Sequence, residues 1–408
     1  MKKKPFSITR RSFFKTAGAA GLGAALSPLV DRTSAKAATP ATAAETSGMP
    51  MRPFGRSGIQ VPILSLGGMF DIPANQTLLK QALRWGVTYW DTAHIYSGGR
   101  SEAGIGQFFE RYPETREKIF LVTKSGGDTP KALQRDLLTS LDRMRTDHVD
   151  LFFVHGIRDA GIMDNRLRAW SEAQKAAGRI RLFGFSTHSN MERCLLDAAR
   201  MGWIDGIMMT YNFRLMHSPR MQEAVKACVE AGIGLTAMKT QGGGAVRTDA
   251  AEELALAGRF VQKGFTDKQA KLKAVWENPQ IAAICSQMPT MSILMANIAA
   301  AVDRTTLSEN DRRHLERYAQ TTYAGYCAGC THICEKTLGG GVPVGDVMRF
   351  LMYARSYGDT TGARQQFAEL SESVRQKLPR MDYSLAESRC PRRLPIARLM
   401  REATDELA

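Results

Sequence analysis

Four polar side chains of complementary acid–base character follow apolar segments in the first half of the chain. Asp91 and Tyr96 are five residues apart in YWDTAHIYSGGRSE (89–102), while Lys124 and His155 end the apolar runs KIFLVTK and VDLFFVH. An apolar run that ends in a polar residue is typical of a buried strand that delivers this residue to its carboxyl end. We therefore expect a carboxylate, a phenol, an ammonium and an imidazole to converge on a proton-donating site.

The elements that must position these side chains follow an alternating pattern. From residue 62 onward, short apolar runs alternate with helix-like runs, as in a parallel sheet with crossover helices. The predicted strands are 63–66, 88–92, 119–123, 150–154, 182–186, 206–210, 234–238 and 281–285. The predicted helices are 76–85, 102–110, 131–144, 166–177, 191–201, 221–231, 267–277 and 292–302. Eight of each predict an α/β fold of the (β/α)8 TIM barrel type. An open dinucleotide-binding sheet is disfavoured, because no GxGxxG follows the first strand.

These motifs together resemble the aldo/keto reductase family, whose tetrad is Asp, Tyr, Lys and His in this order. The segments GRIRLFGFSTHSN (178–190), MMTYN (208–212) and GIGLTAMKTQGGG (232–244) are also similar, and the resemblance covers roughly residues 50–305. It implies a TIM barrel with its active site at the carboxyl ends of the strands. It also implies hydride transfer between a nicotinamide cofactor, NAD(P)(H), and a small carbonyl or alcohol substrate.

The resemblance assigns a role to each member of the tetrad. Tyr96 is the expected proton donor. A free phenol has a pKa near ~10, and a nearby ammonium lowers that pKa. Lys124 is predicted to do so while paired with Asp91, and His155 is predicted to orient the carbonyl or relay the proton. His94 and His188 are candidates for the substrate mouth, with packed core histidines as the alternative.

The resemblance also implies a cofactor site in and after the later strands. Some residues of this predicted site face the nicotinamide ring, on which Tyr211 would stack. Others follow strands seven and eight, where they would approach the diphosphate. The residues of the predicted site are Ser186, Tyr211, Asn212, Gln241, Gly242, Gly243, Thr290 and Asn297. The family usually carries a basic residue here for the 2′-phosphate of NADP, but QMPTMSILMAN (287–297) contains no Lys or Arg. The choice between NAD and NADP therefore stays open.

The seven cysteines fall into two groups. Cys194, Cys228 and Cys285 lie in apolar runs and are predicted core thiols. The others are Cys327, Cys330, Cys334 and Cys390, which form C-x₂-C-x₃-C and a later Cys-Pro. Segment 306–408 resembles the ferredoxin-like extension of some aldo/keto reductases, and four thiolates suffice for one [4Fe–4S] cluster. Two clusters are excluded because Ala324, Arg380, Tyr383 and Ala386 stand at the remaining cysteine positions.

Other interpretations of the four tail cysteines stay open. They are two disulfides, a zinc ion with His332, or a remnant without a ligand. The interpretations of these cysteines allow two functions other than carbonyl reduction. One is an electron-transfer or ligand-binding protein with an inert barrel, an iron–sulfur cluster and a redox partner. The other is a disulfide-stabilised barrel that binds a ligand without redox chemistry.

The first 37 residues have the features of a twin-arginine export signal. Arg10-Arg11 precede Ser-Phe-Phe-Lys, a weakly apolar segment follows at 16–30, and Ala35-Lys36-Ala37 offers a cleavage site. The segment is too short for a stable membrane span. We expect export by the twin-arginine translocase to the periplasm, with a linker at 38–50, the barrel at 51–305 and a helical cysteine-bearing extension at 306–408.

The net charge of +15 is concentrated in this leader, which holds eight basic residues and one acidic residue. The remaining basic residues are scattered, and no nucleic-acid-binding motif is present. Nucleic acid is therefore not an expected partner.

Overall fold

The computed structural model describes residues 48–246 and 265–408. The predicted export signal at 1–37 and most of the predicted linker lie outside the described residues. The described residues form a barrel and a helical extension within one compact unit. In this part of the chain, no helix is long and apolar enough to cross a membrane.

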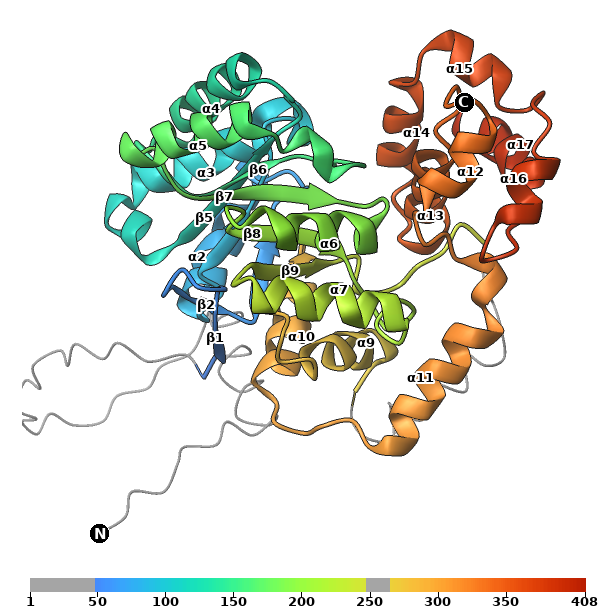
Figure 1. Ribbon diagram of the computed structural model, residues 1–408. Coiled ribbons are helices and arrows are strands. Elements are labelled where there is room, and N and C mark those ends of the chain that lie inside the picture. The colour runs from blue at the N-terminus through green and yellow to red at the C-terminus, as the bar shows by residue number, and fades with distance from the viewer. Residues whose placement is uncertain (1–47, 247–264) are drawn as a thin grey trace, which may run out of the picture. The chain divides into compact units, whose positions relative to one another are not determined.

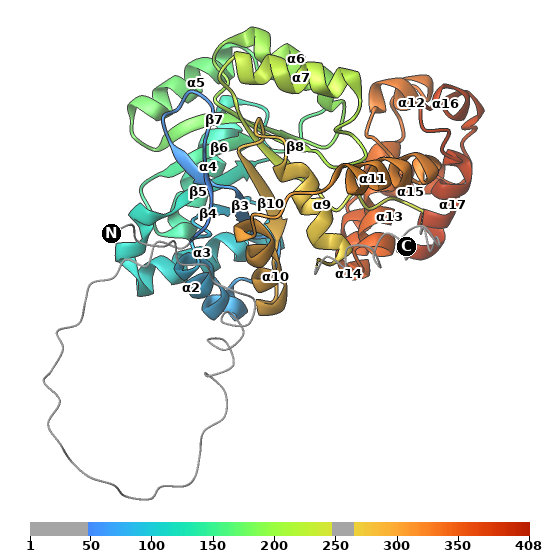
Figure 2. The same ribbon diagram turned by 90° about the horizontal axis from the view of Figure 1, so that it is seen from below.

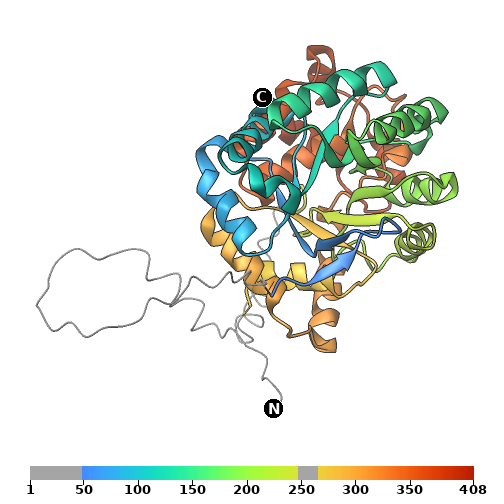
Figure 3. The same ribbon diagram turned by 90° about the vertical axis from the view of Figure 1, so that its left-hand side faces the viewer.

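Eight parallel strands close into a barrel, and β10 pairs with both β9 and β3. The strands are β3 (Leu64–Gly67), β4 (Tyr89–Asp91), β5 (Phe120–Ser125), β6 (Val149–Val154), β7 (Ile180–Thr187), β8 (Gly206–Thr210), β9 (Gly234–Met238) and β10 (Ala283–Gln287). The helices that alternate with them are α2 (Gln76–Arg84), α3 (Arg100–Arg111), α4 (Pro130–Met144), α5 (Asn165–Ala176), α6 (Met191–Met201), α7 (Pro219–Glu230), α9 (Asp267–Trp276) and α10 (Met291–Val302). Helices surround the strands (Figure 3). The predicted TIM barrel is confirmed.

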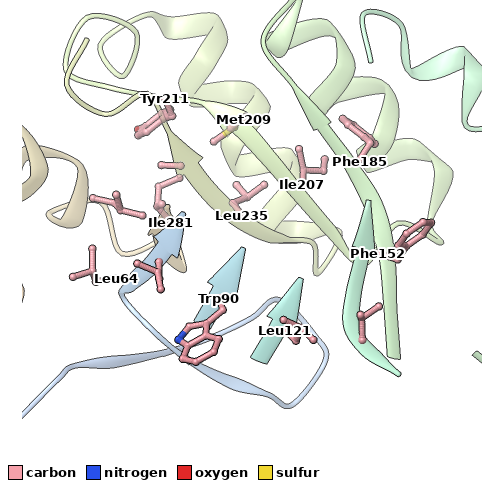
Figure 4. Packing of buried hydrophobic residues seen from close by; sticks show 14 of the residues in the cluster. Leu64, Trp90, Leu121, Phe152, Phe185, Ile207, Met209, Tyr211, Leu235 and Ile281 are labelled. Carbon is pink, nitrogen blue, oxygen red and sulfur yellow. The ribbon is translucent and has the colours of Figure 1, made fainter. Parts of the chain in front are cut away.

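Alternation along each strand divides its apolar side chains between two cores. Tyr89 and Phe153 pack inside the barrel. Trp90 and Phe152 pack on the side that faces the helices (Figure 4). Both cores are therefore apolar, which explains why the strands are apolar almost throughout.

The same alternation turns the polar strand ends inward. Because side chains repeat every two residues in a strand, Asp91 shares the inner face with Tyr89. Lys124 likewise follows Val122 of the inner core by two positions, and His155 follows Phe153 of β6. The strands thus place these three side chains at the carboxyl mouth of the barrel.

Side-chain caps fix the start of several helices. Thr129 accepts a hydrogen bond from the Ala132 N–H at 3.3 Å and begins α4. Thr266 and Gln269 form a reciprocal capping box at the start of α9. Such caps satisfy the free N–H groups of the first helical turn.

Some boundaries of the barrel elements, and one element that precedes the barrel, differ from the prediction. The last strand runs from residue 283 rather than 281, and an unpredicted antiparallel hairpin precedes the barrel. Its strands are β1 (Met51–Pro53) and β2 (Gln60–Pro62). Phe54 in the connecting turn is fully buried in the inner core. At Gly206 and Gly234, which begin β8 and β9, a side chain would clash with the Phe54 ring, so Phe54 plugs the amino-terminal end of the barrel.

The extension is helical, as predicted. It comprises α11 (Glu309–Thr321), α12 (Thr331–Thr337), α13 (Val344–Ser356), α14 (Thr360–Ala368), α15 (Glu372–Lys377), α16 (Ser384–Arg389) and α17 (Ile396–Leu407). Short 3-10 helices occupy loops of the chain: η1 (Pro73–Asn75), η2 (Tyr96–Gly99), η3 (Pro113–Lys118), η4 (Ala160–Ile162) and η5 (Tyr323–Gly325). The extension has a separate apolar core, centred on Val347 and Leu351 of α13 and Leu399 of α17. Figures 1 and 2 show its helices grouped beside the barrel.

Candidate active site

The predicted tetrad converges at the carboxyl mouth of the barrel. The Lys124 Nζ donates to Asp91 Oδ2 at 2.6 Å and to the Thr92 carbonyl at 2.7 Å, and lies 3.4 Å from the Tyr96 hydroxyl. The Tyr96 ring meets the His155 ring edge-to-face, with 5.7 Å between ring centres. Asp91 and Lys124 are almost completely buried, whereas Tyr96 and His155 are partly exposed. The two groups that would meet a substrate are therefore those that remain accessible.

Burial decides the acidity of Tyr96. It raises the pKa of this phenol by more than the Lys124 ammonium lowers it, and the Asp91 carboxylate raises it further. Lys124 thus acts in the predicted direction, but burial outweighs it, so that the pKa of Tyr96 lies above its ordinary value. Tyr96 remains protonated at neutral pH, with its hydroxyl beside a cation.

Lys124 and Asp91 form a buried ion pair that holds the ammonium in place. Burial disfavours the charged form of Lys124, but Asp91 and Tyr96 together raise the pKa of Lys124 above its ordinary value. Cys285, predicted as a core thiol, lies beside this pair, with its Sγ 3.6 Å from Asp91 Oδ2. Cys194 and Cys228 are fully buried, as predicted.

The two histidines near the mouth are neutral. Burial, followed by the charges of Lys124, Arg349 and Lys239, lowers the pKa of His155 to about 3. The same cations and burial lower the pKa of His188, whose Nδ1 lies 3.0 Å from the Thr210 hydroxyl. A neutral imidazole can both donate and accept a hydrogen bond, which suits orientation of a carbonyl.

His94 does not face the mouth. Its backbone carbonyl accepts from Arg143, and its ring lies 3.5 Å from the Ser140 hydroxyl and 3.9 Å from Asp136, all three on α4. The packed-histidine alternative therefore describes His94, while His188 lines the mouth.

The polar side-chain groups of several predicted cofactor residues already make hydrogen bonds within the chain. The Ser186 hydroxyl accepts from the Gly156 N–H, and the Asn297 amide donates to Ser286. Thr290 caps α10. Tyr211 lies in the outer core, where its hydroxyl accepts from Asn278 at 2.9 Å (Figure 4), so the structure does not bring it to the tetrad.

Asn212 joins the barrel to the extension. Its side-chain amide donates to the Lys239 carbonyl at 3.1 Å and to the Tyr326 hydroxyl at 2.9 Å. Its amide oxygen accepts from the Arg214 N–H. All of its hydrogen-bonding groups are thereby in use.

The glycine run after β9 packs against the extension. The Ser356 hydroxyl of α13 lies 3.1 Å from the Gly244 N–H and 2.7 Å from the Gly244 carbonyl. A side chain at Gly243 would come within 2.7 Å of Ser356 and Tyr357. The Gly242 carbonyl accepts from Arg214. The backbone that was expected to approach a diphosphate thus approaches α13 instead.

A cavity at the mouth is lined by both regions of the chain. The lining residues with polar side chains are His188, Thr210, Lys239, Tyr326, Cys327 and Arg349. Arg158 after β6 pairs with Glu335 at 2.7 Å and also with Asp346 at the start of α13. The extension therefore forms one wall of this cavity, which His188, Thr210 and Lys239 of the barrel also line.

The sequence analysis did not single out Lys239 or Arg349, although signals for both were present. Lys239 ends the apolar run GLTAMK, as Lys124 ends KIFLVTK. Arg349 and Tyr353 are four residues apart on a largely apolar helix, so they share one face of α13.

The four tail cysteines line a second cavity, together with Ile333, Val344, Leu394 and other mostly apolar residues. All four are free thiols. Burial raises the pKa of Cys330 to about 11 and that of Cys334 to about 12. Among the described residues, no group of three or more His, Cys, Asp or Glu is arranged to hold a metal ion. The predicted [4Fe–4S] cluster and the zinc and disulfide alternatives therefore all lack support in the described residues.

The sequence of the barrel matches a known family. The model of the aldo/keto reductase family matches residues 65–301, which is more than half of the chain. The chain belongs to the aldo/keto reductase family.

Individual relatives are distant. Uncharacterized oxidoreductase YrpG of Bacillus subtilis is 26% identical over 216 residues, covering 47% of this chain and 66% of that protein. Aldo-keto reductase yakc [NADP(+)] of Schizosaccharomyces pombe is 28% identical over 184 residues, covering 42% of this chain and 53% of that protein. The matched segments thus span between half and two thirds of these relatives.

A solved structure supports the fold alone. The aldo-keto reductase AKR11C1 from Bacillus halodurans (holo form) superposes with a TM-score of 0.54 at 21% identity. The match covers 66% of this chain and 96% of that one.

Proposed function

We propose that this protein is an exported oxidoreductase that reduces a small carbonyl compound, or oxidises the corresponding alcohol, with a nicotinamide cofactor. One observation carries the proposal. The Lys124 ammonium bridges the buried Asp91 carboxylate and the partly exposed Tyr96 hydroxyl beside His155. This arrangement aims a protonated phenol at the mouth of the barrel.

The residues present fit a nicotinamide cofactor in part. The side-chain oxygen of Gln241, just after β9, is buried without a hydrogen-bond partner among the described residues, so it could accept from an amide or a ribose hydroxyl. The glycine run does not offer a free cradle, because its backbone is bonded to α13. Gln241, whose side-chain amide donates to the Lys268 carbonyl, would hold part of the cofactor, which supplies a hydride when reduced.

Tyr96 would deliver the proton in the reduction. As a hydride reaches the carbonyl carbon, negative charge develops on the carbonyl oxygen, which becomes a much stronger base than a phenolate. The Tyr96 O–H bond breaks, and its proton forms the new hydroxyl. Lys124 stabilises the resulting phenolate, and the neutral His155 imidazole donates to the same carbonyl oxygen and aligns it.

Titration of mature protein with NADH and NADPH, followed by tryptophan fluorescence, tests cofactor binding and selects between the two cofactors. We expect saturable binding. Tyr96→Phe should bind cofactor equally well and lose at least about 100-fold in carbonyl reduction, because general acid catalysis contributes about 10²–10⁴-fold. Tyr112→Phe, at a partly buried position after α3, is the control. Full turnover by Tyr96→Phe would refute the assignment.

Location in the periplasm is part of this proposal and rests on the twin-arginine pattern at 8–15. Fusion of residues 1–50 to a reporter that is active only after folded export would test it. Replacement of Arg10-Arg11 by Lys-Lys should then abolish the periplasmic signal.

A second candidate function rests on the thiol cavity. Cys327, Cys330, Cys334 and Cys390 would hold one [4Fe–4S] cluster, whose chemistry is one-electron transfer. Because a cluster binds thiolates, its insertion would release protons from these thiols. Cys327 lines both this cavity and the mouth cavity, so the two sites adjoin. Iron and acid-labile sulfide in anaerobically purified protein, lost in Cys330→Ser, would support electron transfer, whereas their absence would refute it.

A further inference from the structure

Two cations from distant parts of the chain meet in the mouth cavity. Lys239 directly follows β9, and Arg349 lies on α13 of the extension. Arg349 pairs with Asp346 at 2.8 Å, and Asp346 also pairs with Arg158. In the described part of the chain, no carboxylate lies within ion-pair distance of Lys239. Among the described residues, the cavity therefore has positive charge that the surrounding carboxylates do not balance.

The backbone directs Lys239 into the cavity. Met238 packs in the inner core, so a regular strand would turn the next side chain outward. Instead, Lys239 has φ of 56°, in the left-handed region that is unfavourable for a residue with a Cβ. The hydrogen bond from Asn212 to its carbonyl holds this conformation. The backbone at Lys239 is therefore strained, and this conformation places the Lys239 ammonium in the cavity.

Tyr353 keeps the two cations together. Its ring is almost buried, and the Lys239 Nζ lies 4.4 Å from the ring centre. Burial raises the pKa of Tyr353, but the charges of Lys239 and Arg349, and their hydrogen bonding to the phenol, lower it overall. The Lys239 ammonium therefore lies over the Tyr353 ring, and Arg349 shares the face of α13 that bears Tyr353.

The same two cations lie near the reacting groups. Both contribute to the low pKa of His155 and of His188. His155 is in turn in edge-to-face contact with Tyr96. Lys239 and Arg349 thus act electrostatically on His155, and both line the same cavity as His188.

We propose that Lys239 and Arg349 bind the carboxylate of the substrate, so that this protein acts on small carbonyl acids and the extension supplies half of the anion site. The reduction itself rests on the function proposed above, but the anion site does not. Charge-assisted hydrogen bonds from two cations would select an acid over its neutral amide. Met348 and Met352 line the remaining wall and would contact the carbon skeleton.

Calorimetric titration of the full-length mature protein with malonate, and with malonamide as the neutral counterpart, tests this proposal. We expect saturable malonate binding and at least about tenfold weaker malonamide binding. Lys239→Gln and Arg349→Gln should each weaken malonate binding at least about tenfold. Lys336→Gln, at an exposed position on α12, should change it by less than about twofold. Equal affinity for the two probes, or unchanged malonate binding in Lys239→Gln, would overturn the proposal.

Two further arms separate the alternatives. Arg349→Gln removes one of the two cations that pair with Asp346, so this variant can fail to fold. Lys239→Gln leaves no carboxylate unpaired among the described residues. If Arg349→Gln does not fold, Lys239→Gln alone tests the proposal. The cations could instead serve the diphosphate of a cofactor. Malonate should still bind when NADH or NADPH is saturating, and displacement by the cofactor would overturn the substrate assignment. Malonate binding without any cofactor binding would refute the proposed reductase and leave the anion site standing.

Discussion

At the scale of single residues, the tetrad shows how burial and charge compete. Lys124 lies 3.4 Å from the Tyr96 hydroxyl, but removal of the phenol from water dominates its acidity. His155 is held neutral by burial and by three neighbouring cations. The site therefore contains a protonated phenol and a neutral imidazole over a wide range of pH.

The pH dependence of turnover follows from these two directions. Because the pKa of Tyr96 is raised and that of His155 is lowered to about 3, neither group changes charge between about pH 5 and pH 9. We expect kcat for carbonyl reduction to vary by less than about threefold across this range. Steady-state kinetics at saturating cofactor measures it. An alkaline fall with a midpoint near pH 8 would show that Lys124 outweighs burial.

Stability should depend on pH through the same histidine. The pKa of His155 is about 3 in the folded chain and 6.5 as the ordinary value, so the unfolded chain binds the extra proton between these pH values. Folding stability is therefore lost as pH falls below about 6.5. His155→Gln should lose less Tm between pH 7 and pH 4.5 than the parent protein. An equal loss in both proteins would contradict the neutral buried imidazole.

At the scale of elements, the barrel was predictable because strand and helix periods differ clearly in this sequence. Asp91, Lys124 and His155 could be placed because a polar residue at the end of a buried strand must face one mouth. The role of the glycine run could not be predicted. Its packing depends on contacts with Ser356, more than 100 residues away, and no local pattern encodes such a contact.

The loop before α12 depends on a glycine that touches the barrel. Gly329 has φ of 73°, and a Cβ there would lie 2.3 Å from the His188 carbonyl oxygen. Gly339 has φ of 65° with nothing within 4 Å. Gly339→Ala should therefore cost about 1 kcal/mol for the backbone alone, and Gly329→Ala at least about 2–3 kcal/mol. Denaturant unfolding measures both, and equal costs would mean that the close approach is absent in solution.

At the scale of the whole molecule, the extension completes the mouth of the barrel. Asn190 before α6 accepts from the His332 backbone N–H at 3.1 Å, and Asn212 donates to Tyr326 at 2.9 Å. Cys327 belongs to both cavities. Helix α13 and the thiol-bearing loop thus form part of the wall of the mouth cavity, together with His188, Thr210 and Lys239 of the barrel.

Arg158 is the side chain on which this docking most depends. It lies after β6 and pairs with Glu335 at 2.7 Å and with Asp346, both partly buried in the extension. In Arg158→Met, Glu335 loses its cation and Asp346 keeps only Arg349. Because buried carboxylates without a partner are costly, and Arg158 is itself partly exposed, we expect a loss of about 1–2 kcal/mol in unfolding free energy.

The region of the chain that loses protection shows whether Arg158 holds the extension to the barrel or stabilises the whole protein. In Arg158→Met, hydrogen exchange should accelerate in α12 and α13 while β5 and β6 keep their protection, because local opening releases the extension before the barrel unfolds. Arg168→Met is the matched control, since Arg168 pairs only with Glu172 one turn along the exposed face of α5. Uniform acceleration in the barrel and the extension would contradict a separable wall. Faster exchange confined to α12 and α13, with weaker malonate binding, would tie the anion site to the docked extension.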